Sequence, residues 1–224
     1  MSGDENQSEQ ANRDALTPSC PQSLTRRSAA LVRRGLAEAL TLQSSDAYYY
    51  RGDMKYDNGD YDGAIADFTK AIEINPRHAN GHTLRGMAKR NKGDFVGAIE
   101  DYTKAIEINP RLAIPWHNRG LAKYYDGDYD GAIEDYTKAI EINPRYADAH
   151  YNCGFTKCCK GDYGGAVDDY SKAIEISPRF AKAYYSRGLA KRDKGDLDDS
   201  RADFAKATEI DPQEYGPNGL RNAR

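Results

Sequence analysis

Apolar residues recur at helical spacing in a segment whose commonest form reads GAIEDYTKAIEINP. In one copy Ala98, Tyr102 and Ala105 lie three and four positions apart, which places them on one stripe of a helix. Pro110 follows in that copy, and proline cannot continue a helix. The pattern therefore predicts an amphipathic helix that packs through small and aromatic residues and ends before a proline.

The segment returns with a period of 34 residues, so the chain is a tandem repeat. Two independent ladders share this period: Pro76, Pro110, Pro144, Pro178 and Pro212, and Gly52, Gly86, Gly120, Gly154 and Gly188. The ladders define five units: 45–78, 79–112, 113–146, 147–180 and 181–214.

A Gly-Asp pair lies midway in each unit, from Gly59-Asp60 to Gly195-Asp196. Glycine can end one helix in the left-handed conformation, and aspartate can cap the next helix. Each unit is therefore predicted to be a helical hairpin. Because a single hairpin cannot bury its apolar face, we expect stability to come from stacked neighbours.

The third unit closely resembles the signature of the tetratricopeptide repeat family, with Trp116, Gly120, Tyr129, Ala132, Tyr136, Ala139 and Pro144. The other units vary this pattern conservatively, so the resemblance covers residues 45–214. It implies an all-α fold, a right-handed α-solenoid of five hairpins. In that family the first helices line a concave groove and the second helices form the convex back.

One departure from the family is an arginine before the glycine of most units, where leucine is usual: Arg51, Arg85, Arg119 and Arg187, with Cys153 as the exception. Each second helix carries an aspartate that faces this position across the hairpin: Asp67, Asp101, Asp135, Asp169 and Asp203. We expect a ladder of partly buried Arg-Asp pairs. Two solvated faces that merely repeat are the alternative.

The N-terminal region differs from the repeats. Residues 1–24 are polar and contain two prolines, which predicts a disordered tail. Residues 25–44 include the amphipathic stretch SAALVRRGLAEALTL, which we interpret as a helix that caps the array. Because arginines cluster there, a helix that binds a partner or a membrane surface stays open as an alternative.

The fifth unit has Arg201 and Thr208 where the other units have isoleucine or valine. A polar face suits a terminal repeat that has no neighbour to cover it, so we expect a complete array that stays monomeric. Residues 215–224 form a short tail with at most a stunted helix after Pro217.

Charge and hydropathy narrow the classes of partner. The 32 basic and 35 acidic residues nearly balance, so no strong field favours nucleic acid or an anionic membrane. The apolar runs are too short for an integral membrane segment, and the acidic start lacks the features of a secretory signal. We expect a soluble cytoplasmic protein.

No phosphate-binding loop, nucleophile elbow or metal-spaced histidine pair occurs in the sequence, so we expect no enzyme, no catalytic residues, no cofactor and no metal. Cys153, Cys158 and Cys159 share one predicted helix, but thiols five residues apart do not converge on its surface. A thiol-based metal or redox protein stays open as an alternative.

The groove implied by the resemblance is rich in tyrosine, which suits a peptide or helix of another protein. We expect an adaptor whose groove also presents Tyr56, Arg90 and Asn91. Lys182 and Arg192 should favour an acidic end on the ligand. The predicted peptide contacts are Tyr49, Tyr50, Asn118, Tyr124, Tyr151, Asn152, Lys182, Tyr185 and Arg192.

A second family mode, the basic clamp for acidic chaperone tails, is not expected here. It needs lysine and arginine in one unit, but Lys182 is followed one turn later by Ser186. The upstream positions hold Tyr151 and Phe155 instead of the required partners. A self-assembling structural array is the other alternative, although the polar face at Arg201 opposes it.

Overall fold

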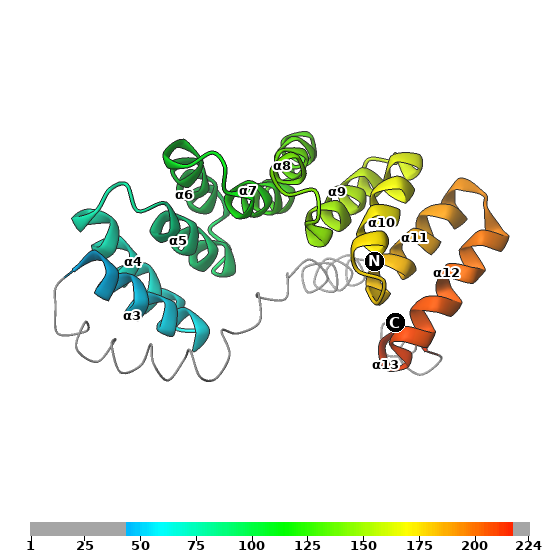
Figure 1. Ribbon diagram of the computed structural model, residues 1–224, viewed down its shortest axis with the longest axis horizontal. Helices are drawn as coiled ribbons and strands as arrows, with labels where there is room; N and C mark the ends of the chain where they lie inside the picture. The colour runs from blue at the N-terminus through cyan, green and yellow to red at the C-terminus, as the bar shows by residue number, and fades with distance from the viewer. Residues whose placement is uncertain (1–43, 217–224) are drawn as a thin grey trace, which may run out of the picture. The chain divides into compact units, whose positions relative to one another are not determined.

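A computed structural model describes residues 44–216, and within that range every regular element is a helix (Figure 1). The described chain falls into two compact parts, here called the N-terminal body (44–128) and the C-terminal body (129–216). The predicted disordered tail, almost all of the predicted capping helix and the predicted helix after Pro217 lie outside the described residues.

The N-terminal body contains α3 (Ser45–Asp57), α4 (Tyr61–Ile74), α5 (Ala79–Asn91), α6 (Phe95–Ile108) and α7 (Ala113–Tyr125). Each helix packs on the next along the chain, so α3–α4 and α5–α6 are hairpins and α7 lies against α6. The predicted all-α fold of tandem helical hairpins is confirmed here.

The C-terminal body contains α8 (Tyr129–Ile142), α9 (Ala147–Cys159), α10 (Tyr163–Ile176), α11 (Ala181–Lys194), α12 (Leu197–Ile210) and α13 (Pro212–Tyr215). Here α9–α10 and α11–α12 are hairpins, α8 packs on α9, and α10 packs on α11. The short helix α13 lies against α12.

The turns inside the hairpins use glycine as predicted. Gly59, Gly93 and Gly161 have φ values of 77°, 83° and 81°, a left-handed conformation that favours glycine. The aspartate after each of them accepts a hydrogen bond from a glycine N–H in the first turn of the next helix, at 2.9 Å in all three turns. Asp196 makes no such side-chain cap on α12, so the predicted cap is absent there.

The second glycine ladder has a packing explanation. A methyl group at Gly86 would lie 2.8 Å from the ring of Tyr102, and one at Gly188 would lie 2.7 Å from Phe204. Glycine on the first helix therefore lets the aromatic ring of the second helix sit directly on the backbone. Small residues complete the contact, since Ala98 and Ala105 are fully buried.

The C-terminal end differs from the prediction. Pro212 ends α12, but it also begins α13, which Asp211 caps by accepting from the N–H groups of Gln213 and Glu214. Tyr215 is buried, and its carbonyl accepts a hydrogen bond from Thr208 Oγ1 at 2.8 Å. The expectation of an uncovered polar face at Thr208 was therefore wrong, because the chain turns back to cover that position.

Candidate functional site

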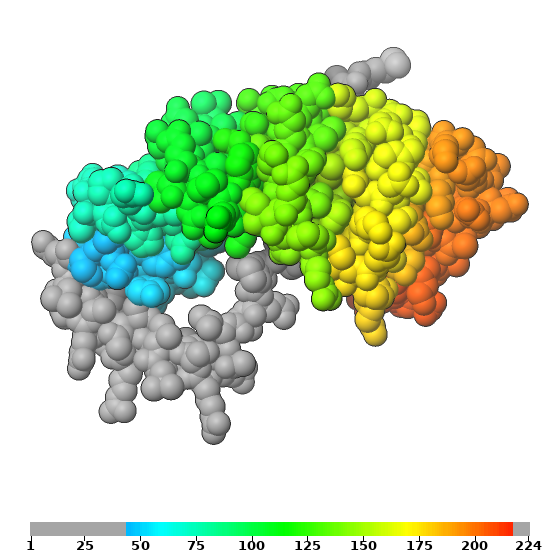
Figure 2. Space-filling view, turned by 45° about the horizontal axis from the view of Figure 1, so that its top comes forward, coloured from blue at the N-terminus to red at the C-terminus, as the bar shows by residue number. Residues whose placement is uncertain are grey.

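The first helices of consecutive units lie next to one another. In the N-terminal body α3 contacts α5 and α5 contacts α7, and in the C-terminal body α9 contacts α11. Figure 2 shows the N-terminal body as one continuous surface from α3 (blue) to α7 (green). We call the side formed by α3, α5 and α7 the first-helix face of the N-terminal body.

The predicted residues on α3 form an aromatic cluster. Tyr49 stacks on His78 with 4.8 Å between ring centroids and meets Tyr50 edge-on at 5.3 Å. Burial, with the nearby Asp53 carboxylate, raises the pKa of Tyr49 to about 12. Tyr50 is 43% exposed, so this tyrosine offers open surface.

The predicted residues on α7 differ in exposure. Tyr124 is half-buried and meets Tyr125 edge-on at 5.5 Å. Asn118 is only 3% exposed, and its Oδ1 accepts a hydrogen bond from Arg90 Nη1 at 3.3 Å. Asn118 therefore already has a hydrogen-bond partner on the first-helix face, the side chain of Arg90.

A polar network on this face was only partly anticipated from the sequence. Asn91 Nδ2 donates to the Tyr56 hydroxyl at 2.9 Å, and Arg90 Nη2 donates to Asn91 Oδ1 at 3.4 Å. With the Arg90–Asn118 bond, the network links α3, α5 and α7. The family geometry predicts Tyr56, Arg90 and Asn91 in the groove, but no repeated pattern marks them as peptide contacts.

In the C-terminal body, Tyr151 supports other side chains. It is 3% exposed, its hydroxyl lies 3.2 Å from Ser186 Oγ, and its ring packs against Phe180 and Tyr170. Lys182 Nζ lies 5.5 Å from the centre of the Tyr151 ring, a cation–π contact. The structure thus brings together two predicted residues, Tyr151 and Lys182.

The other predicted residues of this body are less available for contact with a ligand. Asn152 is 3% exposed, and Tyr185 packs against Tyr215 with 4.9 Å between ring centroids. Arg192 is exposed, but its Nε donates to Asp193 at 2.9 Å. Burial lowers the pKa of Lys182, and the charges of Glu214 and Asp148 act in the opposite direction.

The predicted Arg-Asp pairs form within the bodies. Arg85 Nη2 and Nε donate to Asp101 at 2.6 and 3.0 Å, and Arg187 bonds Asp203 in the same two-pronged way. Arg51 makes the equivalent pair with Asp67. The alternative of two solvated faces is therefore wrong for these three pairs, whose aspartates are buried.

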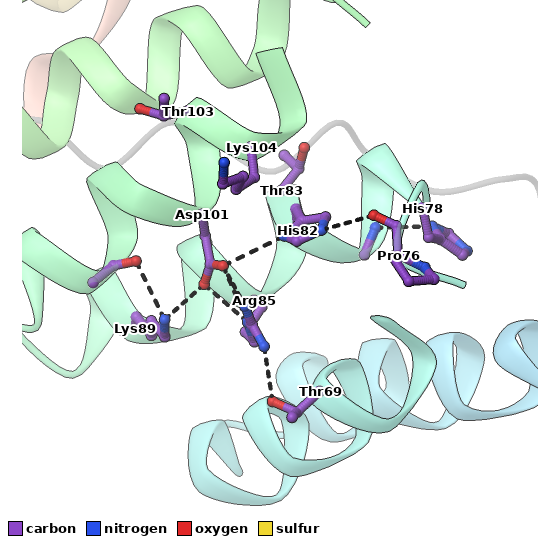
Figure 3. Close-up of polar contacts among 12 residues, drawn as sticks. Thr69, Pro76, His78, His82, Thr83, Arg85, Lys89, Asp101, Thr103 and Lys104 are labelled. Carbon is purple, nitrogen blue, oxygen red and sulfur yellow. Dashed lines mark hydrogen bonds and ion pairs between the residues drawn. The ribbon is translucent and has the colours of Figure 1, made fainter. Parts of the chain in front are cut away.

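Asp101 is the centre of a cluster that also includes Lys89 and His82 (Figure 3). Lys89 Nζ lies 2.8 Å from its carboxylate, and His82 Nδ1 lies 3.6 Å away. Burial alone raises the pKa of Asp101, but contacts with His82, Arg85 and Lys89 outweigh it and lower the pKa to about 2. Every cation around Asp101 is thus already paired, so we assign the cluster to stability.

The Arg85 guanidinium also joins neighbouring hairpins. Its Nη1 donates to Thr69 Oγ1 on α4 at 3.1 Å, while its other nitrogens hold Asp101 on α6. Arg187 repeats this arrangement, since its Nη1 donates to Ser171 Oγ on α10 at 3.0 Å. Arginine suits this role because its five N–H donors form a rigid fork.

The three thiols on α9 are free cysteines. Cys153 is buried, and burial together with the charge of Asp169 raises its pKa to about 12. Burial also raises the pKa of Cys158. Both thiols are therefore protonated near neutral pH, whereas redox and metal chemistry uses the thiolate.

Residues 44–216 contain neither a candidate metal site nor a candidate membrane span. No group of three or more His, Cys, Asp or Glu side chains in this range is arranged to hold a metal ion. No helix in the same range is both long and apolar enough to cross a membrane.

Family models match most of the described chain. Models for the tetratricopeptide repeat match residues 45–78 and 181–214, and a TPR repeat model matches 86–127, 122–157 and 158–191. No curated protein sequence matches the chain significantly.

Several solved structures have the same fold. Two crystal structures of MamA are 30% and 32% identical to this chain, each with a TM-score of 0.68. The alignments cover 78% and 73% of this chain and 95% of each MamA chain. YrrB, described as a TPR protein with an unusual peptide-binding site, is 18% identical with a TM-score of 0.67 over 84% of this chain and 96% of its own.

Proposed function

The chain belongs to the tetratricopeptide repeat family and is a protein-interaction scaffold, and we propose that it binds a peptide or helical segment of a partner protein along its first helices. A non-catalytic adaptor role in the cytoplasm, as a monomer, is part of this proposal. The likeness to YrrB concerns the fold alone, so the proposal rests on this chain's own residues.

The observation that carries the proposal is the composition of the first-helix face. Tyr50 on α3 is 43% exposed, Tyr49 next to it is half-buried, and Tyr124 on α7 is also half-buried. Tyrosine buries a large area at a low entropic cost and has a hydroxyl for peptide groups. The rings of Tyr49 and Tyr124 are held in place by contacts with His78 and Tyr125. Binding a peptide therefore costs little further side-chain entropy at these two positions.

The polar network supplies what an extended peptide needs beside these rings. Asn91 presents an exposed amide group on this face, whereas Asn118 is 3% exposed and already accepts a hydrogen bond from Arg90. Amide side chains both donate and accept hydrogen bonds, so they can match backbone N–H and C=O groups. In the C-terminal body, Lys182 adds a half-buried cation above Tyr151.

Selection from a random peptide library displayed on phage, with the full chain as target, tests the proposal. The affinity of a selected peptide is then measured by fluorescence anisotropy. We expect Tyr50→Ala to weaken binding at least about tenfold, as loss of an aromatic hot spot does. Replacement of Tyr151 or Asn152 is a poorer test, because both side chains are buried and support the fold.

The matched control is Tyr129→Ala. Tyr129 is 37% exposed but lies at the start of a second helix, so its loss should leave the affinity unchanged. If the selected peptides bind the Tyr50→Ala and wild-type chains equally well, the groove assignment fails. Sedimentation at tens of micromolar separately tests the monomer, and a concentration-dependent assembly would favour the structural array.

A further inference from the structure

Arg90 on α5 differs from the paired arginines Arg85 and Arg187 of the first helices. Arg85, five residues earlier on α5, is held by Asp101 at 2.6 Å, and Arg187 is held by Asp203 at the same distance. Arg90 is more deeply buried than either, at 8% exposed, yet no described carboxylate forms an ion pair with it. A charged guanidinium therefore lies inside the first-helix face without a counter-ion among residues 44–216.

The hydrogen bonds that Arg90 does make are few and long. Nη1 reaches Asn118 at 3.3 Å and Nη2 reaches Asn91 at 3.4 Å, both through neutral amide oxygens. Charge-assisted bonds to carboxylates are shorter, as at Arg85, and about twice as strong. Since a guanidinium has five N–H donors, most of the donors of Arg90 remain available.

A second buried group near Arg90 also lacks a partner. The Tyr102 hydroxyl is fully buried and makes no hydrogen bond within the described structure. Burial raises the pKa of Tyr102, and the charge of Arg90 is close enough to oppose that rise. An unsatisfied buried hydroxyl is unfavourable, so it, too, can gain from an acceptor that enters this region.

His117 on the neighbouring helix adds no second charge beside Arg90. His117 on α7 is fully buried, and burial together with the charge of Arg90 lowers its pKa to about 3. The imidazole is therefore neutral at pH 7. Arg90 remains as a single positive charge on a wall of tyrosines and amides.

We propose that Arg90 binds a carboxylate of the partner, either an aspartate or glutamate side chain or a chain-terminal carboxylate, where α5 faces α7. The planar carboxylate accepts two hydrogen bonds from one edge of the guanidinium, and Asn91, which is exposed, can move aside to admit it. This inference rests on the proposed function for the statement that the carboxylate belongs to a peptide. It also moves acid recognition from Lys182 and Arg192 to the N-terminal body.

Nuclear magnetic resonance of the arginine Nε–Hε groups in the full chain tests the site without a known partner. Three probes are titrated at constant ionic strength: N-acetylglutamate α-amide for a side-chain carboxylate, N-acetylglycine for a terminal carboxylate, and N-acetylglutamine α-amide as the neutral match. We expect one or both acids, but not the amide probe, to shift the Arg90 signal saturably. The Arg85 signal is the internal control and should not move, because Asp101 occupies its Nε.

Two variants complete the test. Arg90→Gln removes the charge and should weaken acid binding at least about tenfold, measured from the side-chain amide signals of Asn91 and Asn118. Arg90→Lys keeps the charge, and the loss of one signal in its spectrum identifies the signal of Arg90. This variant should bind the acids severalfold more weakly, because lysine lacks the planar fork of N–H donors of a guanidinium. Circular dichroism and the unchanged Arg85 signal verify the fold of both variants.

The inference is overturned if the Arg90 signal does not move, if the amide probe moves it equally, or if Arg85 responds as strongly. If the acids leave the Arg90 signal unshifted while the chain still binds a peptide whose binding Tyr50→Ala abolishes, the carboxylate site is ruled out and the proposed groove function stays intact. If the acids shift the Arg90 signal but the phage selection yields no peptide, the carboxylate site is supported and the groove function is not.

Discussion

Asp101→Asn is the sharpest test of how the repeats are held together. The substitution keeps the shape of the side chain but removes the charge that Arg85, Lys89 and His82 surround. Because Asp101 is 2% exposed, solvent screens these contacts weakly. We therefore expect the loss to be larger than that of a surface ion pair.

The lowered pKa of Asp101 sets the size of the expected loss of folding free energy. Its value falls from 3.8 to about 2 in the folded chain, which corresponds to about 2 kcal/mol of folding free energy at neutral pH. A folded-state pKa below the unfolded one means that the contribution is present above the unfolded pKa and disappears as pH falls through the folded pKa. About half of it should remain at pH 3 and very little at pH 2.

Urea unfolding of wild-type and Asp101→Asn chains, followed by circular dichroism at pH 7, 4 and 3, measures this difference. Hydrogen exchange of the α5 and α6 amides shows whether the loss is local, as expected for a repeat array. The matched control is Asp169→Asn, since Asp169 is held by Lys157 at 2.7 Å and has Cys153 where other units have arginine.

We expect the control to lose about 1 kcal/mol or less. Equal urea midpoints for Asp101→Asn and wild type at pH 7 would refute the reasoning. So would a difference that is as large at pH 3 as at pH 7.

Three further substitutions test separate contacts. Cys153→Arg should supply the missing guanidinium beside Asp169 and raise the free energy of unfolding at pH 7 by about 1 kcal/mol; a lower urea midpoint would contradict this. Gly86→Ala places a methyl group 2.8 Å from the Tyr102 ring and should lower stability by about 2 kcal/mol, whereas an unchanged melt would argue against this close packing. Tyr215→Ala removes a buried ring and should cost about 3 kcal/mol, with faster hydrogen exchange in α12; unaltered exchange would show that α13 does not hold the last hairpin.

The hairpin fold was predictable because its signals are local and repeated. A glycine with positive φ ends the first helix, an aspartate caps the second, and both recur every 34 residues, as at Gly59-Asp60 and Gly93-Asp94. The Arg-Asp pairs were predictable for the same reason. In each of the three pairs, the aspartate follows its arginine by 16 residues and faces it across one hairpin.

The candidate contacts were harder to predict, since exposure depends on neighbours outside the hairpin. Tyr50 stayed open at 43%, but Tyr151, from the equivalent helix of another unit, is buried under Phe180 and bonded to Ser186. Sequence phase places both residues on the first helices. It does not tell which side chain from outside the hairpin will cover them.

The amino-acid sequence by itself determined the repeat, the hairpin and the Arg-Asp pairing, because each depends on spacing within one unit. The tertiary structure alone decided two features, the burial of Tyr215 against the last hairpin and the isolation of Arg90. The nearest acceptor of Arg90 on another helix, Asn118, is 28 residues away. Whether such a distant position brings a carboxylate or an amide to a buried cation depends on how separate units pack, and no periodicity encodes that.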